Sequence, residues 1–204
     1  MNIGLRKPRM TRDQFFDWAE RQGIRYEFDG LQPVAVTGGT VNHSQITQNI
    51  HFALRTRLRG GPCRPLGPDA GVATVSDAVR YPDAVVTCTK TPGTSRLVDN
   101  PIIVFEALSP TSGRTDRILK LREYRAVATI RRYVILEHAS VGLTVFARST
   151  ANEDWRATAL TAEDTLKIPE IGIEIPVAEF YEDVDLPDPA AEEARPESDV
   201  ATRT

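Results

Sequence analysis

Apolar positions along the first third of the chain follow helical and strand-like spacings in turn. Residues 11–22 begin with Thr11 and carry apolar side chains at helical intervals up to Gly23. Residues 41–59 repeat that spacing and end before a Gly-Gly-Pro sequence. Between them, two strand-like runs flank Asp29 and Gly30. This pattern predicts two helices with a β-hairpin between them.

The rest of the chain is dominated by short strand-like runs. We expect strands over 71–76, 79–88, 101–108, 131–138, 143–148, 155–160, 166–168 and 171–175, a helix over 116–127 and a closing helical turn over 176–184. A clear β-α-β crossover occurs once, around the 116–127 helix. The order of elements therefore predicts an α/β or α+β fold with a mixed sheet.

Length and composition predict one domain with a short appendage. The 204 residues are 41% hydrophobic, which is enough for one sizeable core, and we expect a single domain over residues 1–185. Residues 186–204 are rich in Pro, Glu, Ala and Asp and are predicted to be a disordered acidic tail. The start has no apolar leader-like segment, and no apolar run approaches the roughly 20 residues of a membrane helix. We expect a cytoplasmic protein that does not contact a membrane.

Two cysteines, Cys63 and Cys88, are far apart and lack paired metal-ligand spacing. They are expected to be thiols in or near the core. The net charge of −3 is uneven, because residues 182–204 hold eight acidic residues and two arginines. Residues 114–132 hold seven basic and two acidic residues. That segment is a candidate phosphate-facing surface, and a solvated helix face explains it equally well.

A carboxylate stands where a buried strand would favour another apolar residue. The run PIIVF over 101–105 is bounded by Asn-Pro and Ser-Pro pairs and is typical of a buried strand, yet Glu106 follows it. Burying an unpaired carboxylate costs several kcal/mol, so Glu106 lies at an exposed end or is held by a cation. Asp83, after Pro82, begins another apolar strand, although Pro-Asp alone is more often a turn. Two such carboxylates on neighbouring strands could bind Mg²⁺ with substrate phosphate oxygens.

The chain resembles the Uma-type restriction endonuclease family, a branch of the PD-(D/E)XK nuclease superfamily, in three ordered segments: YPDAVV, IIVFEALSPTSGRTDRILKLREYRAV and IRRYVILEH. Weaker similarity in YEFDG and PVAEFYEDV extends the resemblance over about residues 25–181. It implies a restriction-endonuclease-like fold, a mixed central sheet flanked by helices, and metal-dependent phosphodiester hydrolysis. Asp83 and Glu106 would be the metal ligands, for Mg²⁺ or Mn²⁺.

One departure from the superfamily pattern directs attention to the following helix. The lysine expected two residues after the glutamate is Leu108 here. Asp116, Lys120 and Tyr124 step by four and would share one helix face, so Lys120 could return an ammonium to the metal site. An equally compatible interpretation pairs Lys120 with Asp116 or Tyr124 in a structural face.

Three further residues are candidates for supporting roles. Glu27, in the first hairpin, could supply a carboxylate or hold Lys120, although isolated strand acids more often face solvent. His43 could contact phosphate or cap the 41–59 helix. Ser109 could hydrogen-bond the Glu106 carboxylate.

Three functions are compatible with these residues. The first is a Mg²⁺-dependent endonuclease that hydrolyses DNA, with nucleic acid as partner and a homodimer as candidate assembly. The second is a catalytically silent nuclease-fold module that binds nucleic acid or a protein. The third is a small structural or regulatory protein unrelated to nucleic acid, which would leave Glu106 unexplained.

Overall fold

A six-stranded mixed β-sheet forms the centre of the fold, in the strand order β10-β9-β8-β7-β6-β3. The structure is a computed structural model that describes residues 10–36, 38–109 and 114–186. The strands of this sheet are β3 (Arg64–Leu66), β6 (Ala84–Thr87), β7 (Pro101–Ala107), β8 (Arg132–Leu136), β9 (Gly142–Ala147) and β10 (Arg156–Thr161). Strands β7 and β8 pair in parallel, and the other neighbours pair antiparallel. The predicted mixed central sheet is therefore confirmed.

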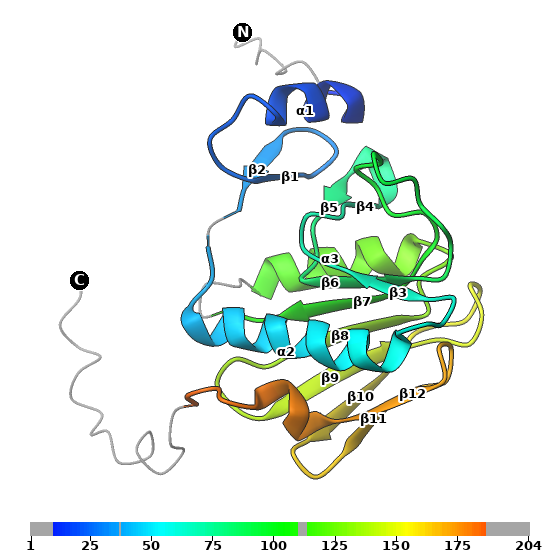
Figure 1. The fold of residues 1–204 in the computed structure, drawn as a ribbon. Coiled ribbons are helices and arrows are strands. Elements are labelled where there is room, and N and C mark those ends of the chain that lie inside the picture. Colours follow the sequence, from blue (N-terminus) through cyan, green and yellow to red (C-terminus); the bar gives the residue numbers. More distant parts are fainter. Residues whose placement is uncertain (1–9, 37, 110–113, 187–204) are drawn as a thin grey trace, which may run out of the picture.

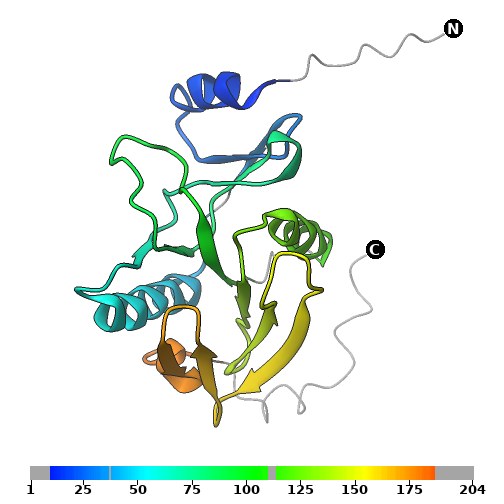
Figure 2. The ribbon, with the colours of Figure 1, turned by 90° about the vertical axis from the view of Figure 1, so that its right-hand side faces the viewer.

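Helices α2 (Val41–Leu58) and α3 (Arg114–Ala126) cover opposite faces of this sheet (Figures 1 and 2). The other helices are α1 (Arg12–Ala19) and the 3₁₀ helices η1 (Val75–Asp77) and η2 (Val177–Tyr181). Successive side chains of β7 alternate between the faces. Ile103 and Phe105 pack in the cluster that includes α2, whereas Val104 packs with Tyr124 of α3. Position 106 therefore faces α3, and this determines the surroundings of Glu106.

A second, four-stranded sheet lies with α1 above the central sheet in the view of Figure 1. Its order is β2-β1-β5-β4. The strands are β1 (Tyr26–Phe28), β2 (Pro33–Ala35), β4 (Val72–Ala73) and β5 (Val79–Arg80). Thr11 and Gln14 form a capping box at the start of α1, and Phe15 stacks on Phe28 with ring centroids 5.0 Å apart. This packing fixes the hairpin that carries Glu27.

The turn of that hairpin depends on two residues that the sequence singled out. The Asp29 carboxylate accepts hydrogen bonds from the backbone N–H groups of Leu31 and Gln32. Gly30 has φ +87°, and a Cβ there would lie 2.2 Å from the carbonyl oxygen of Ser76. The turn therefore requires glycine for both its backbone conformation and its close approach to η1.

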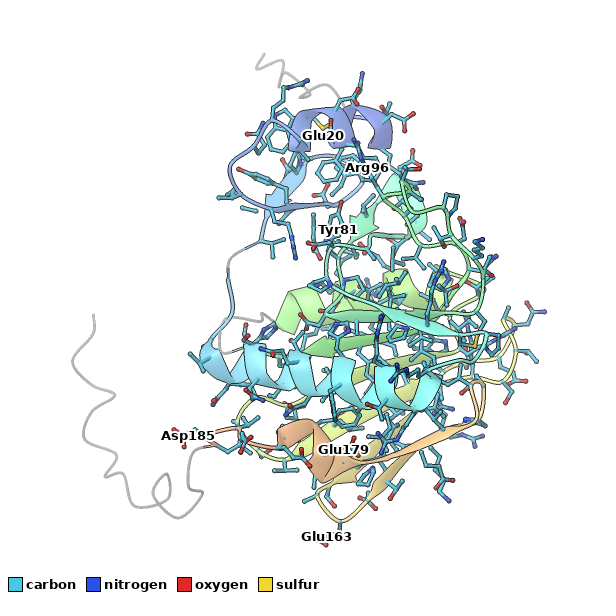
Figure 3. All side chains as sticks on the ribbon, viewed as in Figure 1. Glu20, Tyr81, Arg96, Glu163, Glu179 and Asp185 are labelled. Carbon is cyan, nitrogen blue, oxygen red and sulfur yellow. A yellow bond between two sulfur atoms is a disulfide. The ribbon has the colours of Figure 1, made fainter. Side chains whose placement is uncertain are left out.

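The C-terminal elements pack against α2. Strands β11 (Thr165–Ile168) and β12 (Ile173–Pro176) form a two-stranded sheet, and η2 follows. Phe180 of η2 packs against Phe105, with ring centroids 6.4 Å apart. Arg57 of α2 donates two hydrogen bonds, each of 2.7 Å, to the carboxylate of Glu179, which is labelled in Figure 3. These contacts hold the C-terminal elements against α2 and cover that side of the core.

Most predicted elements are confirmed, and three differ from the expectation. The strand predicted over 71–76 is reduced to β4 followed by η1. The strand predicted over 79–88 is divided at Tyr81 and Pro82, so that β5 joins the small sheet and β6 the central one. Proline has no N–H to donate to a ladder, which favours a break there. Strand β3 was not predicted, because it is three residues long and contains Pro65.

The prediction of two thiols is wrong. A disulfide joins Cys63 and Cys88. The β3–β6 ladder pairs Arg64 with Thr87 in antiparallel register, so the two cysteines occupy the next pair of positions. Their separation of 25 residues in the sequence gave no sign of this neighbourhood.

Two expectations concern the ends and the environment of the chain. The predicted tail falls almost entirely on residues 187–204, which lie outside the described residues, so the boundary of the single domain stays a prediction. Among the helices that the structure describes, none combines the length and the apolar character needed to cross a membrane.

Candidate active site

A cleft of about 760 Å³ lies between β2, the start of α2 and the ends of β6 and β7. The predicted residues that line it are Glu27, His43, Asp83, Glu106, Ser109 and Lys120. Tyr81, which Figure 3 labels between the small sheet and the central sheet, also lines it. Residues that lie far apart in the sequence thus meet in one cavity whose volume suits a small polar group of a larger substrate.

Asp83 is positioned by the strand that follows it. The β6–β7 ladder pairs Ala84 with Phe105, so Asp83 and Glu106 are the next residues along the same pair of strands. One Asp83 carboxylate oxygen accepts the backbone N–H of Ala107 at 2.7 Å. The two carboxylates predicted to adjoin are therefore neighbours at the end of the ladder.

His43, in the first turn of α2, contacts the same Asp83 oxygen. Its Nε2 lies 3.4 Å from Oδ2 of Asp83. This hydrogen bond raises the pKa of His43, against the opposing effect of burial. Gly39 allows the approach, because a Cβ at that position would lie 2.6 Å from Nδ1 of the imidazole. Thr40, rather than His43, caps α2, since its hydroxyl accepts the backbone N–H of His43.

Glu106 projects from β7 toward α3. Nζ of Lys120 lies 3.3 and 3.2 Å from its two carboxylate oxygens, and Tyr124 donates a hydrogen bond of 3.0 Å to Oε1. Residues 120 and 124 share a helix face, so both reach the same carboxylate. Burial raises the pKa of Glu106 to about 7, and the nearby charge of Asp83 adds to the shift while Lys120 opposes it. Lys120 and Tyr124 thus favour the charged form of Glu106, whereas burial opposes it.

Glu27 is buried rather than solvent-facing, with 7% of its surface exposed. Its Oε1 lies 3.6 Å from Nζ of Lys120 and accepts the backbone N–H of Tyr81 at 3.2 Å. Its Oε2 accepts a hydrogen bond of 2.9 Å from Arg80. Lys120 therefore lies between Glu27 and Glu106.

Arg80 and Glu123 complete this cluster and were missed in the sequence. Nε and Nη2 of Arg80 donate to the two oxygens of Glu123 at 2.6 and 2.7 Å, and Thr74 donates to Glu123 at 3.3 Å. Both charged side chains are buried. An arginine in an apolar strand needs a buried carboxylate, so the reasoning applied to Glu106 could have found Arg80 as well.

The remaining predicted residues have varied surroundings. Ser109 lines the cleft, and its predicted hydrogen bond to Glu106 stays a prediction. Asp116 lies in α3, but its side chain is outside the described residues. Leu108, two residues after Glu106, is buried in the apolar cluster with Val104 and Tyr124. A lysine at that position would have to enter the core.

The basic segment over 114–132 is partly neutralised. Arg125 pairs with Asp154, and Arg132 pairs with Glu170 at 2.9 Å. Lys120 is engaged in the cleft, whereas Arg122 is exposed. Fewer cations of this segment face solvent unpaired than its composition indicated.

The donor set can be tested against a metal ion. In the part of the chain that the structure describes, no group of three or more His, Cys, Asp or Glu side chains is arranged to hold one. Mg²⁺, however, is commonly held by one or two carboxylates together with water and phosphate oxygens. Asp83 and Glu106 supply two hard oxygen ligands at the cleft. The residues present therefore fit a hard divalent cation.

Comparisons with known proteins show the family to which the chain belongs. The model of the Uma2 family, described as "Putative restriction endonuclease", matches residues 12–178. The uncharacterized protein slr1290 of Synechocystis sp. is 27% identical over 176 residues, covering 85% of this chain and 92% of that protein. A second Synechocystis protein, the uncharacterized sll1609, is 20% identical over 159 residues, covering 76% and 89%.

A solved structure shares the fold. The crystal structure of "a putative nuclease belonging to DUF820" from Anabaena variabilis superposes with a TM-score of 0.69, at 12% identity, covering 85% of this chain and 98% of that one. At this identity the likeness concerns the fold alone. The family match spans most of the sequence and confirms the predicted resemblance: the chain belongs to the Uma2 family of restriction-endonuclease-like nucleases.

Proposed function

We propose that the protein is a divalent-metal-dependent endonuclease that hydrolyses phosphodiester bonds in DNA, with Mg²⁺ or Mn²⁺ as cofactor. One observation carries the proposal: Asp83 and Glu106 end neighbouring strands at one cleft, and Lys120 contacts Glu106 there. Family membership supports nuclease chemistry. The metal, the DNA substrate and the roles of these residues are the parts that need experiments.

The two carboxylates would hold the cation, and their neighbours orient them. The backbone N–H of Ala107 fixes one oxygen of Asp83, and the hydroxyl of Tyr124 fixes one oxygen of Glu106. Such contacts limit the orientations that each carboxylate can adopt. A bound divalent cation would supply positive charge that acidifies a water molecule and polarises a phosphoryl oxygen.

Lys120 would act on the substrate side of the site. Its side chain is 14% exposed, and its ammonium lies at the cleft beside Glu106 and Glu27. From there it can donate to a nonbridging phosphate oxygen or orient the attacking water. His43 would hold a proton at Nε2 against Asp83, which limits the freedom of that carboxylate.

A plasmid-nicking assay with a Mg²⁺ or Mn²⁺ titration tests the proposal. We expect metal-dependent conversion of supercoiled to nicked DNA, and a loss of roughly 10³-fold in Asp83→Asn and in Glu106→Gln. Asp69→Asn is a matched control, since Asp69 also follows a proline but its side chain is 88% exposed. RNA of the same sequence, assayed in parallel, tests the preference for DNA. A folded, metal-loaded protein that nicks no nucleic acid contradicts the proposal.

A silent nucleic-acid-binding module is the second candidate. It is favoured by Leu108 in the core and by the ammonium of Lys120 resting on both oxygens of Glu106. Anisotropy titrations of labelled DNA against salt measure binding without cleavage. Because Arg125 and Arg132 are ion-paired, we expect affinity to fall with salt by a shallow slope, and deletion of residues 186–204 not to weaken binding. A protein that binds DNA and never cleaves it would support this second candidate.

We propose a cytoplasmic location, as expected from the sequence. Thiols are normally kept reduced there, so this location requires Cys63 and Cys88 to be reduced in growing cells, in contrast to the disulfide of the structure. Alkylation of freshly lysed cells followed by mass spectrometry measures the fraction of free thiols. A disulfide found intact under those conditions would contradict a cytoplasmic location.

A further inference from the structure

Arg80 links the hairpin that carries Glu27 to α3, the helix that carries the candidate catalytic residue Lys120. It lies in β5 with 2% of its surface exposed. Nη1 donates to Glu27 of the hairpin at 2.9 Å, while Nε and Nη2 donate to Glu123 of α3 at 2.6 and 2.7 Å. One guanidinium thus uses its planar fork on one carboxylate and a remaining N–H on another.

Both of those carboxylates bear on Lys120. Oε1 of Glu27 lies 3.6 Å from Nζ of Lys120, while Oε2 of Glu27 accepts a hydrogen bond from Arg80. Glu123 follows Lys120 by three residues in α3, so the two side chains emerge close together on the helix. The fork of Arg80 on Glu123 therefore fixes the rotation of the helix segment that carries Lys120.

The charge balance shows what Arg80 prevents. Three carboxylates, Glu27, Glu106 and Glu123, are compensated by two cations, Arg80 and Lys120. Without Arg80, Lys120 would be the cation nearest to Glu27 as well as to Glu106. A buried carboxylate that loses its partner attracts any cation within reach, because leaving it unpaired is costly.

We propose that Arg80 is a positioning residue for Lys120: by holding Glu27 and Glu123, it keeps the ammonium directed to Glu106 and the cleft instead of to Glu27. The proposal rests on the proposed function for its effect on cleavage. Its structural part, the position of Nζ between two carboxylates, does not depend on any activity.

Arg148 provides a matched control for the loss of a buried arginine. It is 6% exposed, and its guanidinium donates to the backbone carbonyls of Ile130, Arg125, Ala151 and Val127. Arg148 is not among the residues that line the cleft. Arg148→Met should therefore destabilise the fold without changing the surroundings of Lys120.

Crystal structures of the metal-free wild-type protein and of Arg80→Met test the position of the ammonium directly. We expect Nζ of Lys120 within about 3.5 Å of Glu106 in the wild type and moved to hydrogen-bond distance of Glu27 in the variant. An ammonium that stays on Glu106 in Arg80→Met overturns the proposal. If the wild-type protein never cleaves DNA, the proposed function fails, and these structures still decide the question of positioning.

Single-turnover kinetics measure the consequence for cleavage at a temperature where all variants are folded. Arg80→Met should lose roughly 10- to 100-fold in kcat with KM changed by less than about threefold, whereas Arg148→Met keeps its kcat. Equal kcat values in the two variants would contradict the proposal.

A double variant covers the case in which Arg80→Met does not fold. Arg80→Met with Glu27→Gln removes the carboxylate that would compete for the ammonium. We expect this protein to fold, to keep Lys120 on Glu106 and to retain more activity than Arg80→Met, or, where the single variant is unfolded, to restore folding with a kcat above that of Lys120→Met. A double variant that folds with Lys120 away from Glu106 would overturn the proposal.

Discussion

Two carboxylates, the buried Glu123 and the partly buried Glu106, lie in the same part of the molecule but are compensated differently. Arg80 donates hydrogen bonds of 2.6 and 2.7 Å to the two carboxylate oxygens of Glu123, and the hydroxyl of Thr74 donates another. Glu106 receives the ammonium of Lys120 at 3.2 and 3.3 Å and the hydroxyl of Tyr124. A planar fork matches carboxylate geometry, whereas an ammonium acts as a point charge that can be exchanged.

This difference is our reason for proposing a chemical role for Glu106 and a structural role for Glu123. The hydrogen bonds from Arg80 and Thr74 engage both oxygens of Glu123, which is not among the residues that line the cleft. Glu106 opens on the cleft, and burial raises its pKa to about 7 in spite of Lys120. We therefore expect access to the cleft and the kind of cation beside a carboxylate, rather than burial alone, to indicate a functional carboxylate.

The largest expected effect concerns the structural member of the pair. Glu123→Gln removes the charge that balances Arg80, and breaking a buried ion pair from one side typically costs about 3–5 kcal/mol. We expect the free energy of unfolding, measured with urea, to fall by that amount. Glu174→Gln is the control, because its pair with Lys167 is more than half exposed and should contribute less than about 1 kcal/mol. Equal effects of the two substitutions would refute the comparison.

The next effect concerns the cation beside Glu106. Lys120→Met should lose cleavage by an amount equivalent to about 3–4 kcal/mol of transition-state stabilisation, or roughly 10²- to 10³-fold in kcat. Metal binding and melting temperature should stay close to those of the wild type. Lys120→Arg should recover little activity, because a guanidinium approaches the same oxygen differently. Cleavage by Lys120→Met at the wild-type rate would instead direct attention to Glu27 or His43.

The sequence predicted candidate site residues on both strands and helices. Asp83 and Glu106 were predictable because both interrupt or open apolar strands, and a carboxylate in such a run needs a partner. Lys120 and Tyr124 were predicted from helical spacing, since they are four residues apart in the helix that follows the strand of Glu106. The candidate residues could thus be named, while their roles stay predictions.

The parts that escaped the sequence depend on contacts between distant segments. Arg80 joins a hairpin and a helix that are 53 and 43 residues away in the chain, which no local pattern encodes. The disulfide of Cys63 and Cys88 depends on the register of β3, a strand too short to predict. The pairing of Arg125 with Asp154 likewise shows why the composition of one segment overstated its free positive charge.

Glu106→Gln should increase the free energy of unfolding, in contrast to Glu123→Gln. The folded-state pKa of Glu106 is raised to about 7 from an ordinary 4.5, so its ionisation destabilises the fold as pH rises between these values. In metal-free protein, Glu106→Gln should raise the free energy of unfolding by about 3 kcal/mol at pH 8 and by about 1 kcal/mol at pH 5. Urea unfolding at both pH values measures this gain. A variant less stable than wild type at pH 8 would show that Lys120 compensates Glu106 fully.

The smallest expected effect tests whether Asp83 shares the weak compensation of Glu106. His43→Gln keeps a hydrogen-bond donor near Asp83 but removes the imidazole, whose charged form the Asp83 carboxylate favours, since that contact raises the pKa of His43. We expect cleavage and Mn²⁺ affinity to fall about 10-fold, the lower end of the range for residues that orient a metal ligand. His51 offers the control, because its Nε2 contacts the backbone carbonyl of Asp83 at 2.9 Å and not the carboxylate. His51→Gln should change both quantities by no more than about twofold, since the β6–β7 ladder and the Ala107 N–H continue to hold Asp83 in place. If the two histidine variants behave alike, the position of Asp83 depends on its backbone rather than on the charge beside its carboxylate, and the contrast drawn for Glu106 does not extend to its neighbour.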